Sequence, residues 1–311
     1  MSKGKAFEYA TAIIFYNHIK QFWGIVQIVN DNNFQNVQAC FNALNNNEQD
    51  ELMRAATAGC IEVLNLEPVL QNINEPLTIS IAPDYFGQAG DVRDVILAKR
   101  GWEIGISCKH NHQALKHQRL SGNIDFGQEW AGYSVSQNYW QNVLPIFNML
   151  QNFRNQGVNW RDLSNHGVSK VNDVYIPLLT NFLQEFDTLD RQYRDLAPKF
   201  MEYLAGRKDF YKFVMDEKHK EVTVYCYNLH GDLGRGGTVP IIPLPNHFIR
   251  KGWKTNRNGS ISNNTLIIEM NNGWIVGLRL HSAASLVETS LKFDSQPIHI
   301  PNNLLTISRR Y

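Results

Sequence analysis

The sequence predicts an α+β fold, with a mixed central sheet flanked by helices and a β-rich C-terminal part. Apolar residues recur with helical spacing in the first 70 residues. Three short strand patterns follow between Leu77 and Lys109, helical patterns return after residue 137, and strand patterns resume at Phe210. Separate runs of helices and strands, without a regular alternation of the two, are typical of α+β proteins.

The first helical pattern covers residues 7–29 and ends at the polar run NDNN. Two or three further helices are predicted over residues 35–70, with breaks at LNNNEQDE and at Glu67-Pro68. Later helical patterns cover residues 137–155 and 174–204, where Pro145 and Pro198 mark kinks or starts. We expect these helices to flank the sheet that the intervening strands form.

The predicted strands before residue 110 are LTISIAP, DVRDVILA and WEIGISCK. Arg100-Gly101 separates the last two, which therefore form a hairpin. After residue 210 the strands include TVYCYNL, TLIIEM and WIVGLRLH, and the turn Asn271-Asn272-Gly273 joins the last two.

The composition is that of a globular protein without a strong overall charge. Lys and Arg number 30 against 29 Asp and Glu, so any nucleic-acid surface must be local. The four cysteines are far apart and have no metal-ligand spacing. The start MSKGKAFEYA lacks the apolar segment of a signal peptide, and no apolar run approaches the roughly 20 residues of a membrane span. We expect a cytoplasmic protein with no membrane partner.

The hairpin carries the residues with the clearest chemistry. With Arg100-Gly101 as a two-residue turn, Asp94 lies opposite Ser107, and Lys109 lies diagonally across from Asp94 on the same face. A carboxylate there can hold a hard cation such as Mg²⁺, and an ammonium can position water and stabilise charge on a phosphodiester. The alternative interpretation of the two residues is an ordinary cross-strand ion pair.

This layout resembles the PD-(D/E)xK nuclease superfamily. Asp94 stands where the first acid is found, and Ser107-Cys108-Lys109 stands at the (D/E)xK tripeptide. Serine cannot replace a carboxylate ligand, so the resemblance implies that a second acid comes from elsewhere in the chain.

Glu8 is the first candidate for the second acid, because GKAFEYA resembles the first-helix motif that brings a glutamate to the metal in many of these folds. Asp91, Glu103 and Asp125 are the alternatives. Asp91 faces away in the simple register and would need a bulge to turn it round. Glu103 is four residues from Ser107, roughly 13 Å along the strand, which is too far to share one ion.

The segments AGDVRDVI, WEIGISCKHNH, ALKHQRLS, IDFGQEW, NWRDL and SLKFD together resemble the HaeIII-type restriction endonucleases over nearly the whole chain. The resemblance implies a type II restriction enzyme that binds double-stranded DNA and requires Mg²⁺, with Mn²⁺ as a substitute. It implies the palindromic target GGCC, blunt ends, and a cognate DNA methyltransferase that acts on the same site. A palindromic target favours a homodimer.

Under this resemblance, residues 1–205 are expected to form the PD-(D/E)xK-like catalytic core with helical flanks, and residues 206–311 the β-rich DNA-recognition part. Asp94, Glu8 and Asp91 would hold Mg²⁺. Lys109 would orient or deprotonate the water that attacks the phosphodiester.

The run KHNHQALKHQRLS is the densest group of cationic and donor side chains, and it is predicted to form a strand end and one short helix near the metal. His110 or His112 could instead bind metal, and in most proteins such a run is a solvated helix face. The C-terminal strands add further basic residues that could contact bases or phosphates. The predicted DNA-binding residues are His110, Asn111, His112, Lys116, His117, Arg119, Arg279 and Lys292.

Two other functions remain open from the sequence. A DNA-binding module without cleavage activity is favoured by Ser107, which stands in the position of an acid. A metal-dependent hydrolase of a small phosphoester would use the same hairpin but would need no basic cluster.

Overall fold

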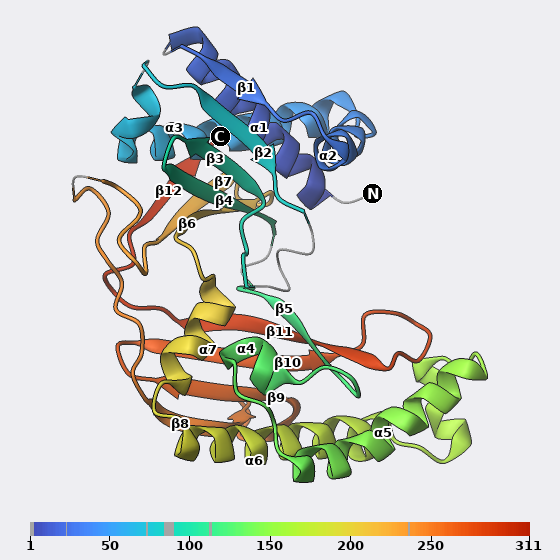
Figure 1. Cartoon of the computed structure of the whole chain (residues 1–311). Helices are drawn as coiled ribbons and strands as arrows, with labels where there is room; N and C mark the ends of the chain where they lie inside the picture. The colour runs from blue at the N-terminus through green and yellow to red at the C-terminus, as the bar shows by residue number, and fades with distance from the viewer. Residues whose placement is uncertain (1–2, 23, 73, 84–89, 112–113, 236) are drawn as a thin grey trace. The chain divides into compact units, whose positions relative to one another are not determined.

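The computed structural model describes residues 3–22, 24–72, 74–83, 90–111, 114–235 and 237–311 (Figure 1). The chain forms two compact units, and each is assembled from separate stretches of sequence. Unit 1 consists of Met1–Gln113, Gly206–Pro243 and Asn302–Tyr311, and unit 2 consists of Ala114–Ala205 and Leu244–Pro301. The predicted division after residue 205 coincides with one of the places where the chain passes between the units, and the chain passes between them at three more.

Unit 1 contains a mixed sheet with the strand order β1-β2-β3-β4-β6-β7-β12. β1 is parallel to β2 and β4 is parallel to β6, whereas the other neighbours are antiparallel. The strands are β1 (Val26–Ile28), β2 (Leu77–Ile81), β3 (Val95–Lys99), β4 (Trp102–His110), β6 (Phe210–Asp216), β7 (Glu221–Tyr227) and β12 (Thr306–Arg310). The helices of this unit are α1 (Lys3–Phe22), α2 (Asn32–Asn42), α3 (Asn46–Leu66) and the 3₁₀ turn η1 (Pro68–Gln71).

The core of unit 1 lies between this sheet and its helices (Figure 1). Phe7 and Phe15 of α1 belong to one buried cluster with Ile106 of β4 and Phe213 of β6. α3 approaches the sheet closely at Gly59, where a Cβ atom would lie 2.7 Å from the ring of Phe213. The alternation of apolar residues along β4 therefore places one face of the sheet in the core and leaves the other for polar side chains.

The first helix is shorter than predicted. α1 ends at Phe22, and Gly24 has a φ of 122°, a conformation that glycine adopts readily and that stops the helix. The β-branched residues beyond it form β1, in which Val26 pairs with Leu77 of β2. The apolar residues of the sequence keep a helical spacing as far as residue 29, but pairing of this segment with β2 makes it a strand instead.

Unit 2 contains an antiparallel sheet with the strand order β5-β11-β10-β9-β8. The turn predicted at Asn271-Asn272-Gly273 joins β9 to β10. The strands are β5 (His117–Ser121), β8 (Phe248–Thr255), β9 (Ile261–Met270), β10 (Trp274–His281) and β11 (Ser290–His299). The helices are α4 (Phe126–Ala131), α5 (Gln137–Asn155), the 3₁₀ helix η3 (Trp160–His166), the π-helical turn η4 (Lys170–Tyr175), α6 (Ile176–Gln192) and α7 (Leu196–Ala205).

Aromatic side chains fill the space between this sheet and its helices. Trp130 of α4 stacks on Tyr203 of α7, with ring centroids 5.5 Å apart, and contacts Phe182 of α6. Phe293 of β11 meets both Trp130 and Phe182. The face of the sheet that carries Phe293 is therefore the core face, and the side chains that alternate with it point the other way.

The α+β class and the β-rich C-terminal part are confirmed, because β6 to β12 all follow residue 206. The short helix predicted within ALKHQRLS is wrong. His117–Ser121 is strand β5, in which Gln118 and Leu120 are buried and pair with β11. Over the described ranges, the structure holds no helix that is long and apolar enough to cross a membrane.

Candidate active site

The hairpin of β3 and β4 has the predicted register. Val95 pairs with Ile106, and Lys99 pairs with Trp102 at the turn. The backbone N–H of Asp94 also donates to the carbonyl of Ile106 over 2.8 Å, which is one residue out of this register, so the β3–β4 ladder becomes irregular at Asp94. The Asp94 carboxylate nevertheless reaches Ser107 and Lys109, which lie on the polar face of β4.

Asp94 is the centre of this polar face. Its Oδ2 atom accepts hydrogen bonds from Ser107 Oγ at 3.2 Å, from the Cys108 N–H at 2.7 Å and from Lys109 Nζ at 3.0 Å. The predicted diagonal contact between Asp94 and Lys109 is thus present as an ion pair. Ser107 does not supply a carboxylate but helps to fix the orientation of one.

Glu8 of α1 lies close to this pair. The residue is 6% exposed, and Lys5 Nζ lies 3.4 Å from its Oε2 atom. Burial raises the pKa of the Glu8 carboxyl to about 8, and repulsion from the Asp94 carboxylate adds to the rise, whereas Lys5 and Lys109 oppose it. The structure therefore brings together the two acids and the lysine that the sequence predicted for one site.

These donors suit a hard cation. Mg²⁺ is typically held by one or two carboxylates and completes its octahedron with water and substrate phosphate oxygens. Within the described part of the chain, no cluster of three or more His, Cys, Asp or Glu side chains is arranged to hold a metal ion. The carboxyl groups of Asp94 and Glu8 would suit Mg²⁺, which takes few protein ligands, better than zinc or calcium, whose structural sites take more.

Lys109 is the cationic member of the group. Burial alone would lower the pKa of Lys109, but the contact with the Asp94 carboxylate outweighs burial and raises it above its usual value. Lys109 is therefore an ammonium ion near neutral pH, which suits orientation of a water or a phosphate oxygen more than removal of a proton.

Asp91, which was predicted as a metal ligand, instead pairs with Arg93. The guanidinium of Arg93 reaches both carboxylate oxygens of Asp91 at 2.8 and 2.7 Å and also contacts Glu103 at 3.1 Å. Arg93 is buried over Gly105, where a Cβ atom would lie 2.1 Å from its Cδ atom. Asp91 and Glu103 are therefore engaged in a structural ion-pair network. Asp125, the remaining alternative, caps helix α4 in unit 2.

We expect Arg93→Met to destabilise unit 1 by about 3 kcal/mol, because Asp91 would lose a buried partner while Glu103 is compensated in part by solvent. This corresponds to a decrease in Tm of roughly 6 to 12 °C in thermal unfolding followed by circular dichroism. Arg100→Met, which removes an exposed arginine from the turn of the same hairpin, is the control and should leave Tm nearly unchanged. Equal Tm values for the two variants would contradict the structural role of Arg93.

The basic run after β4 is divided between the two units. His110 and Asn111 belong to unit 1 and contact Glu217 at 3.2 and 3.3 Å. His112 lies outside the described residues. Lys116 belongs to unit 2, where it is buried with its Nζ atom 3.4 Å from the ring centroid of Tyr203. The burial of Lys116 therefore does not support its predicted contact with DNA.

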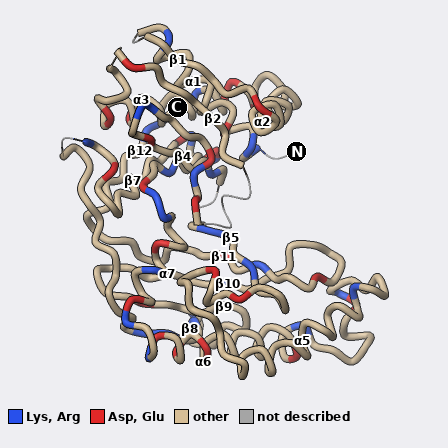
Figure 2. Tube along the Cα trace, viewed as in Figure 1, with Lys and Arg blue, Asp and Glu red and all other residues tan. Residues whose placement is uncertain are grey.

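The other predicted DNA-binding residues meet on one face of the unit 2 sheet. Lys292 of β11 pairs with Arg119 of β5 on one side and with His281 of β10 on the other. Asp294 of β11 pairs in the same way with His117 and Arg279. Figure 2 marks basic residues in blue on the trace of β5 and near β10 and β11. We call this set the polar sheet face: His117, Arg119, Arg279, His281, Lys292 and Asp294.

Asp294 organises part of the polar sheet face. Its two carboxylate oxygens contact His117 Nδ1 at 2.5 Å and His281 Nε2 at 2.9 Å. Burial would raise the pKa of Asp294, but the hydrogen bonds from the two histidines outweigh burial and lower it. Arg279 is exposed on this face, and Arg119 is partly exposed with Nη1 2.9 Å from the carbonyl of Ser290.

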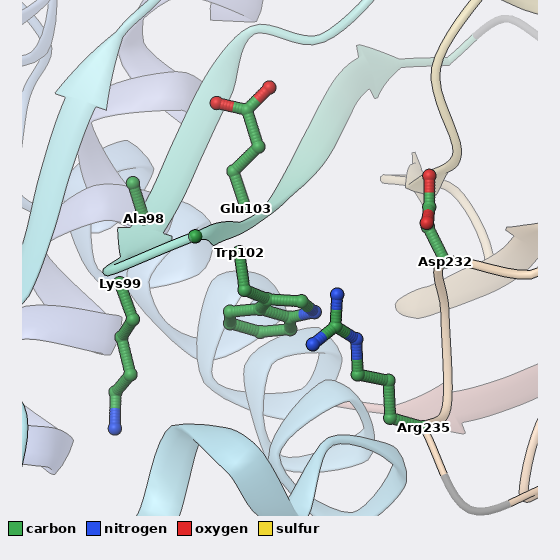
Figure 3. Close-up of a pocket in the computed structure, with 7 residues that line it drawn as sticks. Ala98, Lys99, Trp102, Glu103, Asp232 and Arg235 are labelled. Atoms are coloured by element: carbon green, nitrogen blue, oxygen red, sulfur yellow. The ribbon is translucent and has the colours of Figure 1, made fainter.

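A cavity of about 390 Å³ lies at the turn of the β3–β4 hairpin (Figure 3). Trp102, Glu103 and Arg235 line it, and the guanidinium of Arg235 lies beside the indole of Trp102. Lys109 is six positions along β4 from Glu103, which is roughly 20 Å of strand. This cavity is therefore distinct from the candidate active site.

An acid and a lysine on adjacent strands of a mixed sheet, with a second acid from the first helix, is an arrangement that resembles nucleases of the PD-(D/E)xK type. In comparison with known proteins, residues 4–301 match the HaeIII restriction endonuclease family, and the chain belongs to that family. The chain is 33% identical over 317 residues to the type II restriction enzyme HaeIII of Haemophilus aegyptius, and this similarity covers 98% of the chain and 96% of that relative. No solved structure matches the chain. The family resemblance seen in the sequence motifs is confirmed.

Proposed function

We propose that this protein is a type II restriction endonuclease that hydrolyses double-stranded DNA at the palindrome GGCC and leaves blunt ends. The observation that carries the proposal is the convergence of Asp94, Lys109 and Glu8 in one place of a chain of this family. The target GGCC is the one that the family resemblance implies. A cognate DNA methyltransferase for the same site, and a homodimer on the palindrome, belong to the same proposal.

In the proposed site, Asp94 and Glu8, the latter after losing its proton, would hold Mg²⁺, or Mn²⁺ in its place. When bound, the cation supplies positive charge that stabilises the charge developing on the phosphoryl oxygens and makes a water easier to ionise. Lys109 orients the attacking water and offsets the negative charge of the reacting phosphate. Ser107 and the Cys108 N–H keep the Asp94 carboxylate in place. The products are 3′-hydroxyl and 5′-phosphate ends.

We assign DNA contacts in unit 2 to the polar sheet face. This face carries Arg119, Arg279 and Lys292. Arginine and lysine side chains commonly bind phosphate oxygens or the O6 and N7 atoms of guanine. Asp294 is a carboxylate that could accept from cytosine N4, although the two histidines now occupy its oxygens. In unit 1, His110 and Asn111 follow the catalytic strand directly and remain candidates for phosphate contacts.

Arg279→Ala is expected to weaken binding to a GGCC duplex by at least about tenfold, because an exposed bidentate donor is removed. Fluorescence anisotropy with Ca²⁺ in place of Mg²⁺ measures this affinity. If the affinity of Arg279→Ala depends less steeply on salt concentration than that of the wild type, a phosphate contact has been lost. If the variant discriminates less well between GGCC and altered sites, a base contact has been lost. Arg154→Ala removes an exposed arginine at the end of helix α5 and is the control. Equal affinities for the two variants would remove Arg279 from the DNA-binding surface.

Digestion of a fully sequenced plasmid in Mg²⁺, with an EDTA control and sequencing of the fragment ends, tests the function. We expect discrete, EDTA-sensitive fragments with blunt ends at GGCC. Discrete cuts at another sequence would keep the mechanism and change the target. Resistance of a plasmid methylated within GGCC would support the methyltransferase partner.

A second candidate function is DNA binding without cleavage, which is favoured by the observation that Ser107 is a hydrogen-bond donor to Asp94 and not an acid. Specific binding in Ca²⁺ with no products after long incubation in Mg²⁺ or Mn²⁺ would support this candidate.

A further inference from the structure

A lysine that the sequence analysis did not identify, Lys212, lies beside the candidate active site. β6 runs parallel to β4, and Lys212 is the direct partner of Ser107 in their register. Side chains of directly paired residues project from the same face of a sheet. Lys212 therefore points to the face on which Ser107 and Lys109 contact Asp94.

Lys212 is 3% exposed, and its neighbours on the same face of β6, Phe210 and Val214, are buried and apolar. Burial, with a smaller contribution from the Lys109 ammonium, lowers the pKa of Lys212 to about 7 against the opposing effect of the Asp94 carboxylate. Both charges of the Asp94–Lys109 ion pair thus act on this buried amine.

A buried lysine is costly, and an apolar residue of similar size would pack at this position at a lower cost in free energy. Residues that break such a packing rule concentrate at functional sites. The location of Lys212, beside Ser107 on the face of the proposed catalytic pair, therefore points to a role in the site.

We propose that Lys212 is a positioning residue of the nuclease site, which acts through Asp94 and Lys109 and does not contact DNA. In its protonated form, Lys212 competes with Lys109 for the Asp94 carboxylate. Lys109 is then held less tightly by Asp94 and can turn toward the attacking water and the phosphate. The same charge weakens the attraction of the two carboxylates for a divalent cation. This inference rests on the proposed function.

Lys212→Met tests it, because methionine fills the buried position without a charge. We expect kcat for a GGCC duplex to fall about tenfold to 100-fold, with KM changed less than about twofold and Tm equal or higher. In the absence of DNA, Mn²⁺ should bind about threefold to tenfold more tightly, since a positive charge near the carboxylates is lost. A calorimetric or electron paramagnetic resonance titration with Mn²⁺ measures this binding.

Lys99→Met is the matched control on the same sheet. Lys99 of β3 is 7% exposed, and its Nζ atom donates to the carbonyls of Val69 at 2.8 Å and Asn72 at 2.6 Å. Its loss should lower Tm, because two carbonyls lose their donor, but should leave kcat and Mn²⁺ affinity unchanged. Loss of Lys212 is thus expected to change kcat and Mn²⁺ affinity but not to lower Tm, whereas loss of Lys99 is expected to lower Tm alone.

A Lys212→Met enzyme with wild-type kcat and wild-type Mn²⁺ affinity would overturn the proposal. If the wild-type protein does not cleave DNA, the proposed function fails, and the Mn²⁺ titration alone tests the role of Lys212. Tighter Mn²⁺ binding by Lys212→Met than by the wild type would then support the inference. Equal Mn²⁺ affinity of the two proteins would contradict it. If Lys212→Met does not fold, Lys212→Arg and Lys212→Gln replace it. The charged variant should then bind Mn²⁺ as the wild type does and the neutral one more tightly, and equal affinities would reject the inference.

Discussion

Asp94→Asn is expected to lower the rate of DNA cleavage at least about 1,000-fold, which corresponds to about 4 kcal/mol of transition-state stabilisation. The amide is neutral and is a poorer ligand for a hard cation than a carboxylate. It also weakens the contact with Lys109, which now pairs with Asp94 at 3.0 Å. The protein should still fold, because the amide oxygen can accept from the Cys108 N–H in place of the carboxylate. Single-turnover cleavage of a GGCC duplex in saturating Mg²⁺ measures the effect.

Two comparisons make this result specific. Asp50→Asn, which neutralises an exposed acid on α3, should cleave at the wild-type rate. Asp94→Asn should bind the duplex in Ca²⁺-free buffer as tightly as the wild type or more tightly, because one charge that repels phosphate is removed. A folded Asp94→Asn protein that cleaves at the wild-type rate would exclude Asp94 as a metal ligand.

Lys109→Ala is expected to lower kcat about 100-fold to 1,000-fold, the range typical for removal of a donor that stabilises charge in the transition state. The protonated ammonium is the cationic group paired with Asp94 on the proposed catalytic face. Lys109→Arg should recover only a small part of the activity, since the planar guanidinium cannot take the place of a compact ammonium. Rates measured at saturating DNA and Mg²⁺ separate this effect from weaker binding.

Lys218→Ala is the control for the loss of a positive charge, because Lys218 is exposed in the turn between β6 and β7. Its cleavage rate should equal that of the wild type. If Lys109→Ala raised KM and left kcat unchanged, Lys109 would be a DNA-binding residue and not part of the chemistry.

The Asp94–Lys109 contact could be predicted from the sequence because it depends on local rules. A two-residue turn at Arg100-Gly101 determines the register, and the register determines which side chains are opposite each other. Glu8 could be proposed only from the resemblance of its motif, since its approach depends on how α1 packs on the sheet. The apolar alternation of β4 was visible for the same local reason.

Contacts between distant strands could not be predicted in this way. Lys212 reaches the site through the parallel pairing of β4 with β6, about 100 residues apart, and no turn determines that register. The signal available was a lysine within the apolar strand FYKFVM. The ion pairs of Asp91 could not be predicted, because they depend on how Arg93 packs. The Arg93 side chain is buried against Gly105 of β4, where any larger residue would clash with it, and from there it reaches Asp91.

The repeated passage of the chain between the two units limits how the protein can be divided or recombined. A cut after residue 205 would separate β6, β7 and β12 from the sheet of unit 1, and β5 from the sheet of unit 2. Neither fragment would retain a complete sheet, so a chimera that exchanges only the C-terminal third should not fold. Exchange of the unit to which DNA contacts are assigned in the proposal above would have to move residues 114–205 and 244–301 together and to join four connections at once. In the evolution of such enzymes, this architecture would favour change of specificity by point substitutions on one sheet face over exchange of whole modules.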